Sequence, residues 1–97
     1  MIPNKEITCI VVDDDLIDRL TVMSFLGDYP QMKLLGAYSS PTEALAAAAE
    51  LNPEVLFLDI DMPELDGLQL RAQLMHIPAC VFITSFAEYA VDGFVAR

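Results

Sequence analysis

Residues 55–67, VLFLDIDMPELDG, decide the fold of this chain. The stretch opens with four apolar residues, Val55 to Leu58, and such an unbroken run is typical of a strand buried on both faces of a parallel sheet. Asp59 follows at once, at the carboxyl end of the predicted strand, where open α/β sheets have their ligand crevices. Pro63 and the Asp66-Gly67 pair predict a turn before the next helix. Asp59 is therefore the first candidate for a functional residue.

Strand-like and helix-like segments alternate on both sides of this stretch. The further predicted strands are ITCIVV (7–12), MKLLGA (32–37) and ACVFIT (79–84). The predicted helices cover residues 16–28, 41–51, 67–75 and 88–95. This alternation predicts a parallel sheet with right-handed crossovers and helices on its faces. We expect one α/β domain spanning residues 1–97, the whole of this chain.

Two of the predicted helices carry recognisable start signals. Ser40-Pro41-Thr42-Glu43 is a capping box with proline at the first helical position, and Asp66 is a plausible N-cap for the helix over 67–75. In the helix over 16–28, apolar residues at helical spacing predict a stripe that faces the core. This stripe comprises Leu16, Ile17, Leu20, Met23 and Leu26.

The amino-acid composition of the chain limits the kinds of partner that it can be expected to bind. Fifteen acidic and five basic residues give a formal charge of −10, which argues against nucleic-acid binding and suits divalent cations, although a charge excess alone is typical of a solvated surface. No apolar run approaches the roughly 18 residues of a membrane span, and the start of the chain lacks a secretory signal, so we expect a cytoplasmic protein without a membrane partner. Cys9 and Cys80 lie in apolar strands and are expected to be buried, reduced thiols.

A second acidic group follows the first predicted strand. Asp13, Asp14 and Asp15 are adjacent, and their repulsion could be offset by a bound cation; alternatively they cap the next helix, although a cap needs only one of them. Because parallel strands end at the same edge, Asp13 and Asp14 should meet Asp59 and Thr84 there. An oxygen-rich pocket of this kind suits the hard cation Mg²⁺.

Three blocks of the sequence resemble the receiver domain of two-component response regulators: VVDDD (11–15), FLDIDMPELDGL (57–68) and ITSFAEYA (83–90). The resemblance extends along the whole chain. It implies a flavodoxin-like fold with strand order 2-1-3-4-5, and Mg²⁺-dependent transfer of a phosphoryl group from a phosphohistidine of a sensor histidine kinase. The chain would then modify itself and would not be an enzyme in the ordinary sense.

The resemblance also implies residue roles. Asp59 would be the phosphoacceptor and a metal ligand, forming a 4-aspartylphosphate by attack of its carboxylate. Asp14 would bind Mg²⁺ directly, Asp13 mainly through a water, and Asp61 through its backbone carbonyl. Thr84 would hydrogen-bond the phosphoryl group, and Tyr89 would be the aromatic switch residue. Without the motif, Thr84 is an ordinary satisfied hydroxyl and Tyr89 a core residue of an amphipathic helix.

The chain departs from the family pattern at its end. A complete receiver continues into a fifth strand, near a lysine that contacts the phosphoryl group, and a fifth helix, whereas this sequence has no lysine after Lys33. We therefore expect a receiver fold that lacks the fifth strand and helix, with residues 80–83 as an apolar sheet edge prone to self-association. FAEYAVDGF (86–94) is most similar to receivers attached to LytTR-type DNA-binding domains, which implies a transcriptional output domain missing from this chain.

Two alternatives remain from the sequence. The chain could be a degraded or truncated receiver that works as a dimerisation or kinase-binding module. The run LFLDIDMP also fits the two-aspartate arrangement of haloacid-dehalogenase-like phosphatases, with Asp59 as nucleophile and Asp61 as acid. Against that alternative, Pro63 interrupts the usual motif and an acidic cluster precedes it.

Overall fold

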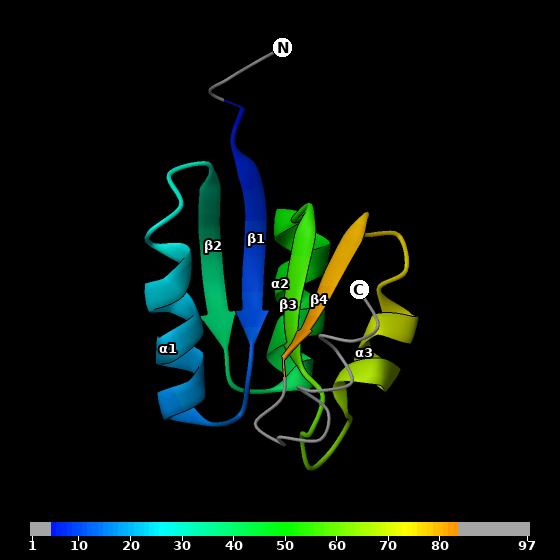
Figure 1. Cartoon of the computed structure of the whole chain (residues 1–97). Helices are drawn as coiled ribbons and strands as arrows, with labels where there is room; N and C mark the ends of the chain where they lie inside the picture. Colours follow the sequence, from blue (N-terminus) through cyan, green and yellow to red (C-terminus); the bar gives the residue numbers. More distant parts are fainter. Residues whose placement is uncertain (1–4, 84–97) are drawn as a thin grey trace, which may run out of the picture.

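The computed structural model describes residues 5–83, in which four strands alternate with three helices (Figure 1). The strands are β1 (Ile7–Val12), β2 (Met32–Tyr38), β3 (Val55–Asp59) and β4 (Ala79–Ile83). The helices are α1 (Leu16–Leu26), α2 (Pro41–Leu51) and α3 (Gly67–Gln73). All neighbouring strands pair in parallel in the order β2-β1-β3-β4, which confirms the predicted α/β fold and its flavodoxin-like order for these strands. The helix predicted over 88–95 lies outside the described residues.

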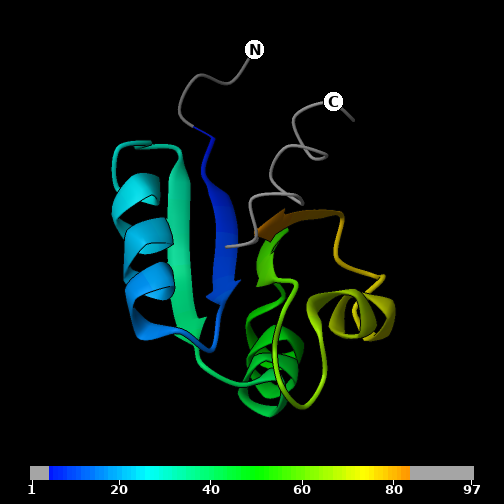
Figure 2. The same cartoon turned by 60° about the horizontal axis from the view of Figure 1, so that its bottom comes forward.

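The sheet has a separate apolar core on each face, because side chains alternate along its buried central strands. Ile10 and Val12 of β1 belong to a cluster that includes residues of α2 and α3, whereas Cys9 and Val11 belong to a second cluster with Leu26 of α1. In Figure 1, α2 lies behind the strands, and in Figure 2, α1 and α3 lie at opposite sides of the view. The central strands β1 and β3 are thus held from both sides.

The register between β1 and β3 brings their carboxyl ends to the same level. Val12 pairs with Leu58, so the residue after β1 and the last residue of β3 stand side by side at the edge of the sheet. All four arrowheads in Figure 1 point to this edge. The fold therefore places Asp13 next to Asp59 although 46 positions separate them in the sequence.

Helices α2 and α3 begin as predicted. Ser40 Oγ accepts a hydrogen bond from the N–H of Glu43 (3.2 Å), and Pro41 occupies the first turn of α2. Asp66 Oδ1 accepts from the N–H of Gln69 (2.8 Å), and the Gln69 side chain accepts in return from the N–H of Asp66 (3.3 Å), which completes a capping box. The sequence predicted the cap but not the second half of the box.

Helix α1 packs through only part of the predicted stripe. Leu16, Ile17 and Leu20 are 55%, 67% and 49% exposed, so the expected stripe does not reach the core at its amino-terminal end. The helix contacts the sheet through Leu26, which is buried, and Val22, which packs against the same cluster. The predicted stripe is therefore confirmed at Leu26 and wrong at Leu16, Ile17 and Leu20.

The two cysteines differ in environment. Cys9 is buried in the middle of the sheet, as predicted, and Cys80 on β4 is only partly buried, which corrects the prediction for that residue. Both are free thiols, and burial raises the pKa of each, with the charge of Arg71 opposing the rise for Cys80. The difference follows the sheet order, in which β1 has a neighbour on both sides and β4 stands last among the described strands. In the described part of the chain, no helix has the length and apolar character needed to cross a membrane.

Candidate functional site

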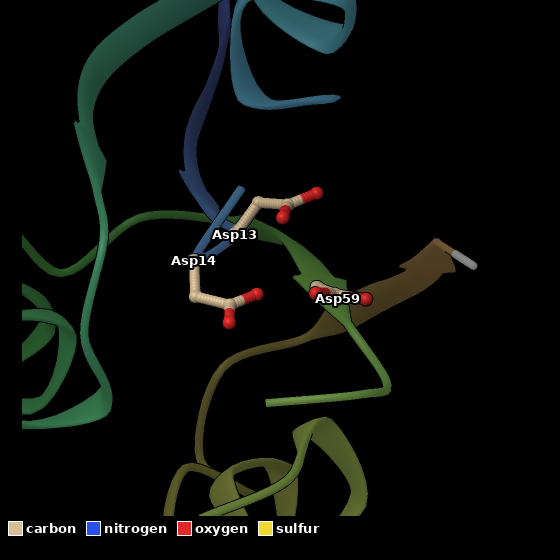
Figure 3. A group of neighbouring side chains, drawn as sticks. All are labelled: Asp13, Asp14 and Asp59. Atoms are coloured by element: carbon tan, nitrogen blue, oxygen red, sulfur yellow. The ribbon is translucent and has the colours of Figure 1, made fainter. Parts of the chain in front are cut away.

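Three carboxylates gather where β1 and β3 end. Asp13 and Asp14 follow β1, Asp59 is the last residue of β3, and each offers an oxygen within 4.8 Å of the others (Figure 3). Asp13 and Asp59 are 1% and 7% exposed, whereas Asp14 is exposed, so the cluster opens to solvent on the side of Asp14. The predicted meeting of these three residues is confirmed. Thr84 and Tyr89 lie outside the described residues.

Asp13 is held at its main chain and at its side chain. Its N–H donates to the carbonyl of Tyr38 at the end of β2 (3.0 Å), and its Oδ1 accepts from the N–H of Asp15 (2.9 Å). Its carbonyl accepts from Nη1 of Arg19, a side chain of α1 (2.7 Å). Three separate segments therefore fix this residue in place.

The third acid of the run has a structural role. Asp15 is the N-cap of α1, and its Oδ2 accepts from the N–H of Asp18 (2.8 Å). It is exposed and is not a member of the carboxylate cluster. The capping alternative is therefore correct for Asp15 alone, which leaves Asp13 and Asp14 available to a ligand.

The loop after β3 turns tightly around Asp59. Asp59 Oδ1 accepts from the N–H of Asp61 (3.2 Å), and the N–H of Gly67 donates to the carbonyl of Ile60 (3.0 Å), which closes the loop before α3. Asp61 is exposed, and its predicted use of a backbone carbonyl as a metal ligand stays a prediction. Sequence reasoning treated Gly67 only as a turn residue and gave Arg19 no role.

The cluster carries negative charge that the described residues do not balance. Burial raises the pKa of Asp59 to about 7; the Asp61 N–H opposes this rise, and the charge of Asp13 adds to it. Burial also raises the pKa of Asp13. Between residues 5 and 83, the carboxylates paired with lysine are those of Glu54 and Glu6. Carboxylate oxygens are hard ligands, so a close group with uncompensated charge fits Mg²⁺.

A comparison with protein families decides the interpretation. Residues 9–96 match the family model of the response regulator receiver domain. The chain belongs to this family. The receiver match covers all three motif blocks up to residue 96, and the phosphatase alternative is not retained. The chain is thus a receiver domain of a two-component system, and receivers bind Mg²⁺ at an acidic cluster of the kind seen here.

Relatives of this receiver include transcriptional regulators. It is 38% identical over 90 residues to the transcriptional regulatory protein BtsR of Escherichia coli K12, covering 91% of this chain and 38% of that protein. It is equally similar, with the same coverage, to an uncharacterized response regulatory protein of Shewanella oneidensis. The chain therefore spans about two fifths of the length of these relatives.

Solved receivers share the fold closely. The response regulator domain of Thermotoga maritima CheB is 31% identical with a TM-score of 0.75, covering 84% of this chain and 62% of that one. The response regulatory domain of mrkE from Klebsiella pneumoniae is 30% identical with a TM-score of 0.74, over 91% and 75% of the two chains. A chain from the complex of the P1 domain of CheA3 with CheY6 of R. sphaeroides is 31% identical with a TM-score of 0.70, over 86% and 67%.

Proposed function

We propose that Asp59 accepts a phosphoryl group from a phosphohistidine of a sensor histidine kinase, in a Mg²⁺-dependent reaction that controls an output domain acting in transcription. One observation carries the proposal: Asp59 ends a central strand within 4.8 Å of two further carboxylate oxygens, in a domain of the receiver family. The names of BtsR and of the CheA3–CheY6 complex support the transcriptional output and a partner of the kinase type.

The reaction needs the carboxylate form of Asp59. One Asp59 oxygen forms a bond to phosphorus while the phosphorus–nitrogen bond of the phosphohistidine breaks, and the imidazole leaves with the bonding electrons and takes a proton from solvent. With its pKa raised to about 7, Asp59 is partly protonated at neutral pH in the absence of a cation. A positive charge that compensates Asp13 and Asp14 would lower the pKa of Asp59. More of Asp59 would then be in the carboxylate form that acts as the nucleophile.

The residues proposed to hold the cation are Asp13, Asp14 and Asp59, together with the backbone carbonyl of Asp61. When bound, Mg²⁺ supplies charge compensation to the phosphoryl oxygens. Burial of Asp13 and Asp59 keeps their carboxylates in place, and the exposed side chain of Asp14 leaves one side open for a phosphodonor. The Asp61 N–H, bonded to Asp59 Oδ1, orients the acceptor.

The proposal extends to two residues outside the described part of the chain. Thr84 hydrogen-bonds the phosphoryl group after transfer, and Tyr89 changes position with it as the aromatic switch. The support for these roles is the family match, which includes both positions. Each phosphodonor molecule transfers one phosphoryl group to the chain itself. The domain therefore acts in signalling and does not convert an external substrate in repeated cycles.

The test is incubation of the purified chain with Mg²⁺ and acetyl phosphate, a small phosphodonor, followed by intact mass measurement. We expect one added phosphoryl group on the parent and none on Asp59→Asn. Asp61→Asn is the matched control, because it removes an exposed carboxylate two residues away and keeps the backbone carbonyl and N–H. Phosphoryl uptake by folded Asp59→Asn would show that another residue is the acceptor. Absence of uptake in the parent and in both variants would contradict the proposed function.

A second candidate function is self-association through the sheet edge or face at β4. Val81 and Phe82 are 45% and 39% exposed, and among the described strands β4 pairs only with β3. An exposed apolar strand with unpaired backbone groups is a template for another chain. Light scattering after size-exclusion chromatography should show a dimer that Phe82→Lys weakens. A monomer over a wide concentration range would exclude this candidate and leave the phosphoacceptor function untouched.

A further inference from the structure

The cation of Arg19 is bonded to the backbone beside the acidic cluster. Its Nη1 donates to the carbonyl oxygen of Asp13 at 2.7 Å, a short distance for a hydrogen bond from nitrogen to oxygen. Arg19 is partly buried and stands one turn into α1, so its side chain reaches back across the turn that separates the helix from β1. No sequence motif pointed to this contact.

The carbonyl that Arg19 binds belongs to the peptide unit joining Asp13 to Asp14. A peptide unit is planar, so holding its oxygen also fixes the direction in which the chain enters Asp14. In a continuing strand, the two side chains would point to opposite faces of the sheet. Here the chain bends at Asp14, and both carboxylates offer oxygens to one cluster with Asp59. The orientation of this one peptide unit therefore decides whether the two acids converge.

Among the hydrogen bonds of Asp13 within residues 5–83, the bond from Arg19 is the one that reaches the carbonyl of that peptide unit. The Asp13 N–H bond to Tyr38 holds the preceding peptide unit. The bond from the Asp15 N–H to Asp13 Oδ1 closes a turn that spans the Asp13–Asp14 unit, but it does not hold the carbonyl oxygen of that unit. Arginine suits the remaining task because its charged, planar group makes a strong hydrogen bond that resists rotation.

We propose that Arg19 is a positioning residue for the metal site, which sets the convergence of Asp13 and Asp14 by holding the carbonyl between them. This inference rests on the proposed function, because it assigns Arg19 to the Mg²⁺ site named there. Residues that orient metal ligands without touching the metal commonly change affinity by about 10-fold or more when they are replaced.

Simple electrostatics predicts the opposite result. Removing a positive charge from the backbone beside Asp13 makes the surroundings of the cluster more negative and should strengthen the binding of a cation. Positioning predicts that the same removal weakens binding. The sign of the change in Mg²⁺ affinity therefore separates the two roles without reference to phosphorylation.

The experiment is calorimetric titration of Mg²⁺ into the parent chain, Arg19→Gln, Arg19→Lys and Arg71→Gln. Arg71 is the matched control, because its guanidinium also donates to backbone carbonyls, those of Leu74 and Ile77, at the opposite end of the sheet from the cluster. We expect about 10-fold weaker binding in Arg19→Gln, an intermediate loss in Arg19→Lys, and parental affinity in Arg71→Gln. Thermal unfolding without Mg²⁺ verifies that each variant is folded.

Equal or tighter binding by folded Arg19→Gln would overturn the inference and leave the proposed metal site in place. Should Arg19→Gln not fold, Arg19→Lys decides, because it keeps the charge and loses the planar group; parental affinity there would also overturn the inference. If the parent chain bound no Mg²⁺, the proposed metal site itself would be wrong and the role of Arg19 would fall with it.

Discussion

Gly67 lies directly against the main chain of Asp59. A Cβ atom at residue 67 would overlap the carbonyl oxygen of Asp59 and would stand 3.1 Å from the Cα of Ile60. The start of α3 therefore approaches the end of β3 as closely as the absence of a side chain allows. This contact therefore holds both the loop of residues 60–66 and the backbone of Asp59, which carries the acceptor carboxylate.

Gly67→Ala should displace the end of β3 from the start of α3. The neighbouring atoms belong to the backbone and cannot move aside cheaply, so we expect a loss of about 1–3 kcal/mol in the free energy of unfolding and lower phosphoryl uptake by Asp59. Denaturant unfolding and intact mass with acetyl phosphate measure the two effects. Gly27→Ala is the control, since residue 27 has a helical φ of −62° and its nearest atom stands at 3.2 Å. Equal stability of the two variants would contradict the close approach.

Asp59→Asn should stabilise the chain at alkaline pH when Mg²⁺ is removed by a chelator. The pKa of Asp59 is about 7 in the folded chain and 3.8 as an ordinary aspartate, so the folded chain binds this proton more tightly than the unfolded chain. The parent therefore loses stability as the pH rises from about 4 to 7, and asparagine avoids this loss. We expect the variant to be about 1–3 kcal/mol more stable at pH 8, and the difference to vanish below about pH 4.

Thermal unfolding across this pH range measures the effect, with about 4–8 °C expected for each kcal/mol in a domain of this size. Mg²⁺ should reduce or reverse the advantage, because the cation stabilises only the chain that binds it. Asp61→Asn serves as the control for loss of a nearby exposed charge. A pH-independent difference between Asp59→Asn and the parent would show that burial of the charge is not the cause.

Glu54→Gln should have the opposite pH dependence. The Thr8 N–H donates to Glu54 Oε1 (3.1 Å) and lowers the pKa of Glu54, with the charge of Lys5 adding to the effect and burial opposing it. Stability from this group is present above its ordinary pKa of 4.5 and is lost as the pH falls through the lowered value. At neutral pH, the melting temperature of Glu54→Gln should be lower than that of the parent, and in strong acid the two should be equal. Glu50→Gln, which removes an exposed carboxylate, is the control.

Asp14→Ala and Asp15→Ala should separate metal binding from helix capping. Loss of the Asp14 carboxylate removes a proposed ligand and should weaken Mg²⁺ binding by about 10-fold or more. Loss of the Asp15 carboxylate removes the N-cap hydrogen bond from the Asp18 N–H and should cost about 0.5–2 kcal/mol of stability. The Mg²⁺ affinity should change little, because the hydrogen bond from the Asp15 N–H to Asp13 is kept. Calorimetry and unfolding together measure both properties. Similar Mg²⁺ affinities in the two variants would refute this division of roles.

The sequence predicted those parts of the fold that have local causes. The apolar run before Asp59 and the caps at Ser40 and Asp66 each follow from the chemistry of a few neighbouring residues, and the structure confirms them. The convergence of Asp13 and Asp14 on Asp59 was also predictable, because parallel strands end at one edge.

The remaining features depend on how separate elements meet. The exposure of Leu16 and Leu20 depends on how α1 lies against the other elements. The role of Asp15 as the cap depends on which of three adjacent carboxylates the turn brings to the helix. The contact of Arg19 with the Asp13 carbonyl exists only after that turn has closed. Residue type and spacing carry no signal for such relationships.

The pairing of Val12 with Leu58 limits the insertions and deletions that the protein can tolerate. Inserting or deleting one residue within β1 or β3 would turn the following side chains to the other face, so every aspartate could remain in the sequence while the cluster was lost. The exposed turn at residues 27–31, away from the cluster, is under no such restriction. Homologues that still signal are therefore expected to conserve the length of these two strands as strictly as the acids themselves.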